Sequence, residues 1–260
     1  MMLALVAGTG ALPPAIMAAF PDALVCALDG FAPDIPVEMT FRLEHLGSFL
    51  AKLTDRGVTQ VCFAGAVQRP LIDPAQIDAA TLPLVPVIKA AMSKGDDGAL
   101  RAIMQLFEAH GMQMVAAHEL VPQLLPVAGV LTSLKPDADM MAEAVLGEGV
   151  VAKLGDLDRG QACVIQGANV LAEEGPEGTD AMLAGVTAQG GILYKAPKPN
   201  QDRRADLPVI GIATARGVIA AGLDGIVVTA GGVMVLDRDA VVDAMDAAGK
   251  VLWVRPETET

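Results

Sequence analysis

The segment KAPKPNQDRRADLP, residues 195–208, gathers acidic and basic side chains in a chain that is only 19% charged. Its prolines exclude a helix and favour an extended backbone. Because alternate residues of an extended segment face the same side, Asp202, Arg204 and Asp206 would fall together. Lysine and arginine neutralise phosphate oxygens, and aspartate either holds a hard cation such as Mg²⁺ or orients a water molecule. The spacing therefore favours phosphoryl chemistry, and the alternative is a solvated loop with surface ion pairs.

The stretch AGTGALPP, residues 7–14, is a second candidate because it follows a predicted strand and precedes a predicted helix. Gly8 and Gly10 would let the backbone approach a phosphate. Leu12 and Pro13 would open a helix whose N-terminus attracts anions. The dinucleotide fingerprint G-x-G-x-x-G is incomplete, because Pro13 stands at its third glycine position. The stretch predicts either contact with a nucleotide or phosphate, or a tight strand-to-helix turn.

Two further loops combine glycine with polar side chains. In FAGAVQRP, residues 63–70, Gly65 ends a predicted strand and Arg69 follows shortly after it. Because the carboxyl ends of parallel strands face the ligand crevice, this loop predicts either ligand contact or an ordinary connection. In SKGDDGALR, residues 93–101, the acidic pair predicts either a helix N-cap or a polar loop that contacts sugar hydroxyls.

Carboxylates are crowded in EEGPEGTDAML, residues 173–183. Within eight residues the stretch carries Glu173, Glu174, Glu177 and Asp180. Such crowding is costly unless the charges are solvated, capped or met by cations. The stretch predicts either a solvated, capped turn or a site where Thr179 and Asp180 hold a ligand.

Strand patterns alternate with helix patterns in the first half of the chain, which is typical of a doubly wound parallel sheet. Strands are expected at 3–8, 23–28, 58–65 and 112–117, and helices at 12–20, 43–56 and 100–110. The second half predicts a hairpin at 161–167 and 169–174, strands at 190–195, 225–231, 233–236 and 250–254, and helices at 138–154, 214–221 and 239–248. We expect a Rossmann-like nucleotide-binding domain at 1–132, a catalytic α/β domain with a mixed sheet at 133–260, and an interdomain cleft.

Composition argues against several classes of protein. The formal net charge is −13 and there is no basic stripe, so nucleic-acid binding is not expected. No run approaches the ~20 apolar residues of a membrane span. Three widely spaced cysteines argue against a disulfide framework and a zinc site, and favour the cytoplasm. Three scattered histidines argue against a histidine-based metal centre.

The order of the motifs along the whole chain is also informative. AGTGALP, FAGAVQRP, KGDDGALR, EGTDAML and KAPKPNQDRRADLPVIG together resemble the LpxI family, the UDP-2,3-diacylglucosamine pyrophosphatases of lipid A biosynthesis. The resemblance implies that water cleaves the pyrophosphate of UDP-2,3-diacylglucosamine, giving UMP and 2,3-diacylglucosamine 1-phosphate (lipid X). It also implies a requirement for Mg²⁺ or Mn²⁺ and a substrate held between two domains.

The resemblance further implies an essential aspartate in the C-terminal domain, which we place at Asp206, with Asp202 as the second candidate. Asp206 would bind the metal ion or orient the attacking water. Lys195, Lys198 and Arg203 would neutralise the phosphates. The substrate-binding residues that we expect are Gly8, Gly10, Leu12, Pro13, Gly65, Arg69, Thr179, Asp180, Lys195, Lys198, Gln201 and Arg203. Because this lipid-linked nucleotide sugar sits in a membrane, we expect a cytoplasmic protein in transient, peripheral contact with the inner membrane. We also expect a homodimer, because twofold dimers are the commonest oligomers.

Two alternatives remain open at this stage. A Rossmann-type oxidoreductase would need the third glycine, although Asp29 could supply its acidic residue. A non-catalytic nucleotide-sugar or lipid-binding protein would use the same residues without turnover.

Overall fold

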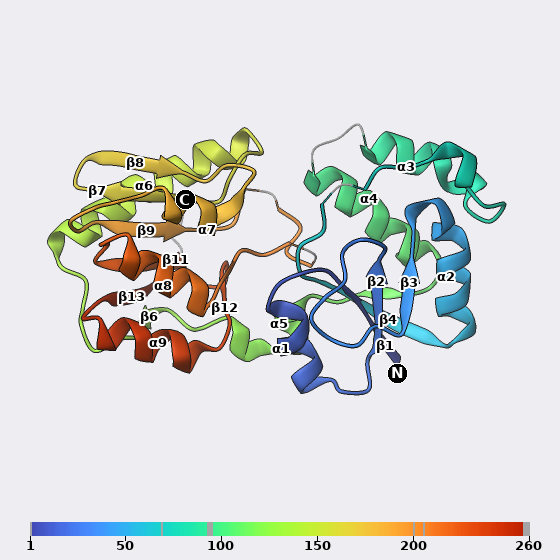
Figure 1. Cartoon of the computed structure of the whole chain (residues 1–260), viewed down its shortest axis with the longest axis horizontal. Helices are drawn as coiled ribbons and strands as arrows, with labels where there is room; N and C mark the ends of the chain where they lie inside the picture. The colour runs from blue at the N-terminus through green and yellow to red at the C-terminus, as the bar shows by residue number, and fades with distance from the viewer. Residues whose placement is uncertain (1, 69, 93–95, 200, 205, 257–260) are drawn as a thin grey trace. The chain divides into compact units, whose positions relative to one another are not determined.

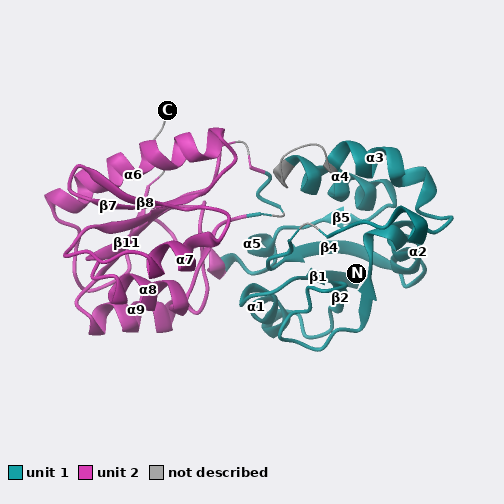
Figure 2. Cartoon of the chain, turned by 45° about the horizontal axis from the view of Figure 1, so that its top comes forward, with its two compact units in different colours: residues 1–122, 202–206 teal, residues 123–201, 207–260 magenta. Residues whose placement is uncertain are grey.

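The computed structural model describes residues 2–68, 70–92, 96–199, 201–204 and 206–256, without the side chains of residues 92, 96 and 97. It separates into two compact units, which Figure 2 shows in different colours. The first unit contains Met1–Pro122 together with the short segment Asp202–Asp206, and the second contains Gln123–Gln201 and Leu207–Thr260. Compact units need not coincide with domains, so the boundary expected at residue 132 stays a prediction.

A five-stranded sheet forms the first unit, with the order β3-β2-β1-β4-β5 and only parallel neighbours. Its strands are β1 (Met2–Ala7), β2 (Leu24–Leu28), β3 (Met39–Phe41), β4 (Val58–Ala64) and β5 (Gln113–Met114). Its helices are α1 (Leu12–Ala19), α2 (Leu46–Asp55), α3 (Val85–Met92), α4 (Asp96–Ala109) and α5 (Ala117–Leu120). Short 3-10 turns are η1 (Leu43–His45), η2 (Pro74–Gln76), η3 (Leu82–Leu84) and η4 (Pro122–Leu124). The predicted parallel sheet is confirmed, and β2 is buried along its whole length, as a strand covered on both faces must be.

Some predicted elements of the first unit differ in extent. The strand expected at 112–117 is reduced to β5, because the chain enters α5 at Ala117. The helix expected at 43–56 begins with the 3-10 turn η1. Neither β3 nor α3 was predicted, since three residues carry too little periodicity and Pro83 and Pro86 obscure the helical pattern.

Aromatic rings fix two helices of the first unit against its sheet. The ring of Phe49 on α2 stacks on Phe41 of β3, with the ring centroids 3.9 Å apart. Phe107 on α4 meets Phe49 and Phe63 edge-on, at centroid distances of 6.2 and 5.3 Å. Such pairs add specific geometry to the apolar area that they bury, so α2 and α4 are held in register with β3 and β4.

The second unit is built on a six-stranded sheet with the order β6-β13-β11-β9-β7-β8. Its strands are β6 (Gly129–Val130), β7 (Ala162–Gln166), β8 (Asn169–Glu173), β9 (Ile192–Lys195), β11 (Gly225–Thr229) and β13 (Val251–Arg255). A small parallel pair is formed by β10 (Val209–Ile210) and β12 (Met234–Val235). The three central strands β9, β11 and β13 are parallel, whereas β6, β7 and β8 are antiparallel to their neighbours. The predicted mixed sheet is confirmed.

Helices cover both faces of this sheet (Figure 1). The helix α6 (Ala138–Asp156) packs on the side chains of Ile165, Tyr194 and Val227. The opposite face carries α7 (Gly178–Ala184), α8 (Ile212–Ala220) and α9 (Arg238–Ala247). Because side chains alternate along a strand, Lys195 at the end of β9 points to the side opposite Tyr194, where α7 lies.

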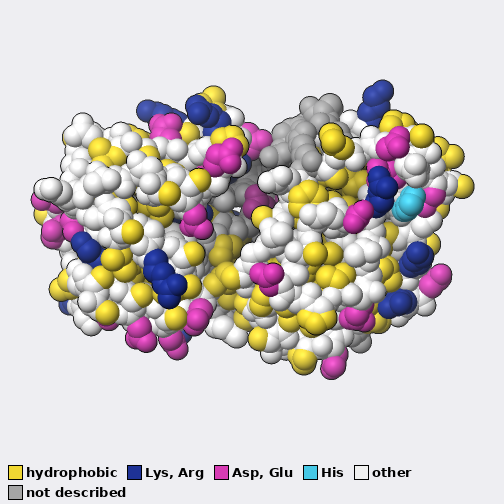
Figure 3. All heavy atoms as spheres, in the orientation of Figure 1, with side chains coloured by type: hydrophobic (Ala, Val, Ile, Leu, Met, Phe, Trp, Pro, Cys, Tyr) yellow, Lys and Arg dark blue, Asp and Glu magenta, His cyan; other side chains and the backbone are white. Residues whose placement is uncertain are grey.

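Charged side chains are scattered over the visible face of each unit, with acidic groups between the basic ones (Figure 3). Among the helices of the described residues, none combines the length and the apolar character needed to cross a bilayer. All three cysteines are buried and unbridged. Burial raises the pKa of each thiol, at Cys26, Cys62 and Cys163, to about 12.

Candidate functional site

A buried charged cluster lies at the carboxyl end of β9. Lys195, Thr179 and Glu174 are only 5, 8 and 7% exposed. The ammonium of Lys195 donates a hydrogen bond to Thr179 Oγ1 at 2.6 Å, and its nitrogen lies 3.8 Å from Glu174 Oε1. The sequence singled out Lys195 and Thr179 separately, and the structure brings them together.

The direction of the hydrogen bonds in this cluster follows from the donors that each group has. Thr179 carries one hydroxyl proton, which it donates to Glu174 Oε1, so that its oxygen accepts from Lys195. The other carboxylate oxygen, Glu174 Oε2, accepts from the backbone N–H of Gln161 at 2.7 Å. The proton of Thr179 is therefore committed to Glu174 in this structure, and its predicted contact with a ligand stays a prediction.

The local sequence explains why Glu174 can be buried here. Glu174 directly follows β8, and Gly160 packs against its backbone so closely that a Cβ on Gly160 would lie 2.9 Å from the Glu174 Cβ. The first turn of α7 brings in Thr179, whereas the neighbouring Asp180 is exposed. Nothing in the local sequence distinguishes Glu174 from the other three crowded carboxylates as the one that turns inward.

Lys198, which follows β9 in the chain, is more exposed than Lys195 and has a different partner. Lys198 Nζ forms an ion pair with Asp158 Oδ1 at 2.9 Å. Its backbone N–H donates to Gln201 Oε1 at 3.0 Å, so Gln201 closes a turn rather than extending the chain. The side chains of Lys198 and Gln201, which we predicted to contact the substrate, are therefore already engaged in contacts that shape this loop.

In the segment Asp202–Asp206, Asp202 is bound by arginine. Arg204 Nε donates to Asp202 Oδ1 at 3.0 Å and Nη2 donates to Oδ2 at 2.7 Å. These hydrogen bonds hold the pKa of the Asp202 carboxyl below its ordinary value. Arg204 Nη1 also lies 2.6 Å from Glu108 Oε1 on α4. Sequence reasoning missed Glu108, because nothing local connects residues so far apart in the chain.

The extended path expected for this segment is wrong at residues 203–204, which form a turn. Asp202 Oδ1 accepts the backbone N–H of Arg204 at 3.1 Å, the pattern by which aspartate starts a turn with its own side chain. The backbone N–H of Asp206 then donates to the Asp202 carbonyl at 3.3 Å. The alternation of Asp202, Arg204 and Asp206 on one side therefore does not arise, and Asp206 is half-buried beyond the turn.

The remaining cation of the motif, Arg203, is exposed. Burial lowers the pKa of His118, the charge of Arg203 lowers it further, and Glu119 acts in the opposite direction. In the described part of the chain, His118 Nδ1 is buried without a hydrogen-bond partner. His118 therefore favours its neutral form beside the predicted phosphate ligand Arg203, a relation that sequence reasoning did not anticipate.

The two glycine loops of the first unit bind each other. Thr9 and Ala66 form an antiparallel bridge, with N–H to carbonyl distances of 3.0 and 2.8 Å. A Cβ on Gly8 would collide with the carbonyl oxygen of Ala66, and one on Gly65 would lie 2.7 Å from the carbonyl oxygen of Thr9. Close packing of the loops is therefore sufficient reason for Gly8 and Gly65 to be glycines.

The helix that follows the first loop offers few donors to an anion. Pro13 and Pro14 lie in the first turn of α1 and have no N–H, and Ala15 already donates to Ala11. Leu12 and Pro13 are buried, whereas Gly10 is exposed with φ +102°. Predicted contact with a phosphate would have to use the N–H groups before Pro13. Arg69, the other candidate here, lies outside the described residues.

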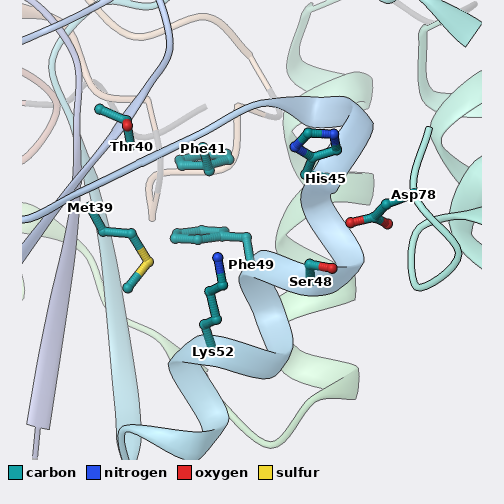
Figure 4. A pocket seen from close by; sticks show the side chains of 8 residues that line it. All are labelled: Met39, Thr40, Phe41, His45, Ser48, Phe49, Lys52 and Asp78. Atoms are coloured by element: carbon teal, nitrogen blue, oxygen red, sulfur yellow. The ribbon is translucent and has the colours of Figure 1, made fainter. Parts of the chain in front are cut away.

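Two cavities occur away from these residues. One, of about 260 Å³, is lined in the first unit by Phe41, Phe49, His45, Lys52 and Asp78 among others (Figure 4). The other, of about 760 Å³, opens at the amino ends of β9, β11 and β13, opposite to Lys195. Neither cavity includes a predicted site residue. Among the described residues, no group of three or more His, Cys, Asp or Glu side chains is arranged to hold a metal ion.

Comparison with known proteins agrees with the order of the motifs. The family model of the LpxI N-terminal domain matches residues 2–124, and that of the LpxI C-terminal domain matches residues 127–253. A curated protein of Caulobacter vibrioides, named UDP-2,3-diacylglucosamine pyrophosphatase LpxI, is 38% identical over 274 aligned positions. The alignment covers 98% of this chain and 98% of that relative.

Proposed function

Because the chain belongs to the LpxI family, we propose that it hydrolyses UDP-2,3-diacylglucosamine to UMP and 2,3-diacylglucosamine 1-phosphate in lipid A biosynthesis. The observation that carries this proposal is the match of both family domains together with a named pyrophosphatase aligned from end to end. No comparable observation favours the oxidoreductase or the non-catalytic binding protein.

Neutralisation of phosphate charge is the part of the reaction that the basic residues would supply. Hydrolysis of a pyrophosphate depends mainly on positioning and on stabilising the charge that develops on oxygen. The ammonium of Lys195 is almost fully buried, and charges act more strongly where water is excluded. Lys198 and Arg203 are the further phosphate partners that we propose, each at a more exposed position than Lys195.

Asp206 is the residue that we assign to a divalent cation. Mg²⁺ commonly takes one or two protein carboxylates and fills its other positions with water and substrate phosphate, so a cluster of three protein ligands is not required. The other carboxylate of this segment, Asp202, is bound by Arg204 through both of its oxygens. A bound Mg²⁺ or Mn²⁺ would neutralise part of the diphosphate charge. The alternative role that we propose for Asp206 is to orient the attacking water molecule.

Incubation of the purified protein with UDP-2,3-diacylglucosamine and Mg²⁺ tests the reaction. We expect UMP and the lipid monophosphate to appear, and a chelator to abolish them. Asp206→Asn should reduce kcat by about 10²-fold or more, while substrate binding survives. Binding of the substrate without any UMP would favour the non-catalytic alternative, and near-normal turnover by Asp206→Asn would remove this residue from the mechanism.

The diacylated substrate also leads us to propose that the protein is cytoplasmic and makes transient contact with the inner-membrane surface. Co-flotation with vesicles that carry the substrate, compared with vesicles that lack it, measures this contact. A homodimer remains a proposal from base rates, and light scattering of the eluted protein measures it.

A further inference from the structure

We infer that Glu174 is a positioning residue that holds the ammonium of Lys195 in place for a phosphate of the substrate. The hydroxyl of Thr179 connects the two side chains by hydrogen bonds. This inference rests on the proposed function. It adds a residue that sequence reasoning treated only as one member of a crowded acidic stretch.

The first argument is charge. Lys195 is 5% exposed, and a buried ammonium is stable only when an opposite charge and hydrogen bonds compensate for lost water. Among the described residues, Glu174 supplies a carboxylate 3.8 Å from the Lys195 nitrogen and is itself 7% exposed. The two charges are therefore retained together, away from water.

The second argument is rigidity. Both oxygens of Glu174 are engaged, one by the Thr179 hydroxyl and the other by the backbone N–H of Gln161. The carbonyl of Gln161 in turn accepts the N–H of Ala196, the residue after Lys195. A closed ring of contacts thus links Glu174, Thr179 and Lys195 back to the backbone of the same strand. A carboxylate held in this way gives the ammonium one preferred place.

The third argument is location. Lys195 is the last residue of β9, which runs parallel to β11. Carboxyl ends of parallel strands are where α/β proteins place ligands. A buried ion pair is weak evidence for stability, because a well-packed apolar pair of the same volume often serves as well. The burial of a lysine at this end of the sheet is better explained by a function of its charge.

The test compares Glu174→Gln with Glu173→Gln, the adjacent exposed carboxylate, in the full-length protein. With UDP-2,3-diacylglucosamine as substrate, we expect Glu174→Gln to reduce kcat/KM by about 10²-fold, the usual scale for a misplaced group, and Glu173→Gln to change it little. Thr179→Val should lose activity in the same way, and Thr179→Ser, which keeps the hydroxyl, should recover most of it. Thermal melting confirms which variants are folded.

A double-mutant cycle separates positioning from a purely structural role. If Glu174 acts through Lys195, Glu174→Gln should cause little further loss in kcat/KM once Lys195→Met is present. The inference is overturned if the two losses multiply, or if folded Glu174→Gln and Thr179→Val keep wild-type kinetics. Should Glu174→Gln fail to fold, the contrast between Thr179→Val and Thr179→Ser decides. A wild-type protein that makes no UMP would instead overturn the proposed function.

Discussion

Arg204 binds the carboxylate of Asp202 through two parallel hydrogen bonds, Nε to Oδ1 at 3.0 Å and Nη2 to Oδ2 at 2.7 Å. Its remaining terminal nitrogen lies 2.6 Å from Glu108 on α4. Paired arginine hydrogen bonds of this kind fix geometry as well as charge. The motif therefore divides into Asp202 and Arg204, which shape the turn, and Asp206, which follows it.

Arg204→Lys should disturb this turn although the charge is kept, because lysine cannot form the paired hydrogen bonds. We expect kcat/KM for UDP-2,3-diacylglucosamine to fall about tenfold through misplacement of Asp206. Glu108→Gln is the matched control. The Arg204–Glu108 pair is partly exposed and worth at most about 1 kcal/mol, so this variant should stay close to wild type. Equal kinetics for Arg204→Lys and wild type would mean that the turn does not position Asp206.

The Asp202–Arg204 pair should also be visible in the pH dependence of stability. Arg204 holds the pKa of Asp202 below its ordinary value, so the pair stabilises the fold above the pKa of the unfolded chain, about 3.9. This contribution is lost as the pH falls from there through the lower pKa of the folded state. Asp202→Asn should therefore be less stable than wild type at pH 7, and the difference should shrink below about pH 4. Urea unfolding at both pH values measures it, and a difference independent of pH would contradict this origin.

The sheets were accessible from the sequence because their signals are local. Apolar runs such as Leu24–Leu28 predict strands that are buried on both faces. Gly167, at φ +58°, indicates the turn of the hairpin between β7 and β8. The position of Lys195 at the end of a strand followed from the same pattern. These features depend on neighbouring residues only.

The side-chain contacts of the candidate site could not be predicted from the local sequence. Crowding of four carboxylates indicated that some of these charges must be compensated, but the contacts that hold Glu174 inward, from Gln161, Thr179 and Lys195, form only in the folded chain. Glu108 meets Arg204 across 96 positions of sequence, and such a pairing exists only after the fold has formed. Spacing likewise suggested an extended segment at Asp202, where the aspartate side chain bonds its own backbone and starts a turn.

Two glycines of the first loop should respond differently to alanine, because they are glycines for different reasons. Gly8→Ala would place a Cβ against the Ala66 carbonyl and should cost about 2 kcal/mol or more of unfolding free energy. Gly10 has open space around it, so Gly10→Ala should cost only the strain of its φ of +102°, about 1 kcal/mol. Denaturant unfolding of both variants measures these costs. A larger loss of substrate affinity than of stability in Gly10→Ala would support the predicted phosphate contact; equal stability losses would contradict the packing argument.

The charge of Glu143, in the second unit, should lower the stability of the fold at neutral pH, whereas that of Asp202 raises it. The Glu143 carboxylate is 6% exposed, and Oε1 accepts the backbone N–H of Gly167 at 2.6 Å. Burial raises its pKa, and the neighbouring charges of Asp224, Asp137 and Asp139 raise it further. A carboxyl whose pKa is raised by folding costs stability at pH values above the folded pKa.

Glu143→Gln removes this charge and keeps an oxygen for Gly167. We therefore expect the variant to melt about 2 °C above wild type at pH 7. The gain should shrink as the pH falls through the raised pKa of the folded state and disappear below about pH 4, where the wild-type carboxyl is protonated in both the folded and the unfolded chain. Asp139→Asn, at an exposed position in the same cavity, is the control and should shift Tm less. A lower Tm for Glu143→Gln at pH 7 would show that the charge itself stabilises this cavity, through a cation or another partner that the uncharged amide cannot hold.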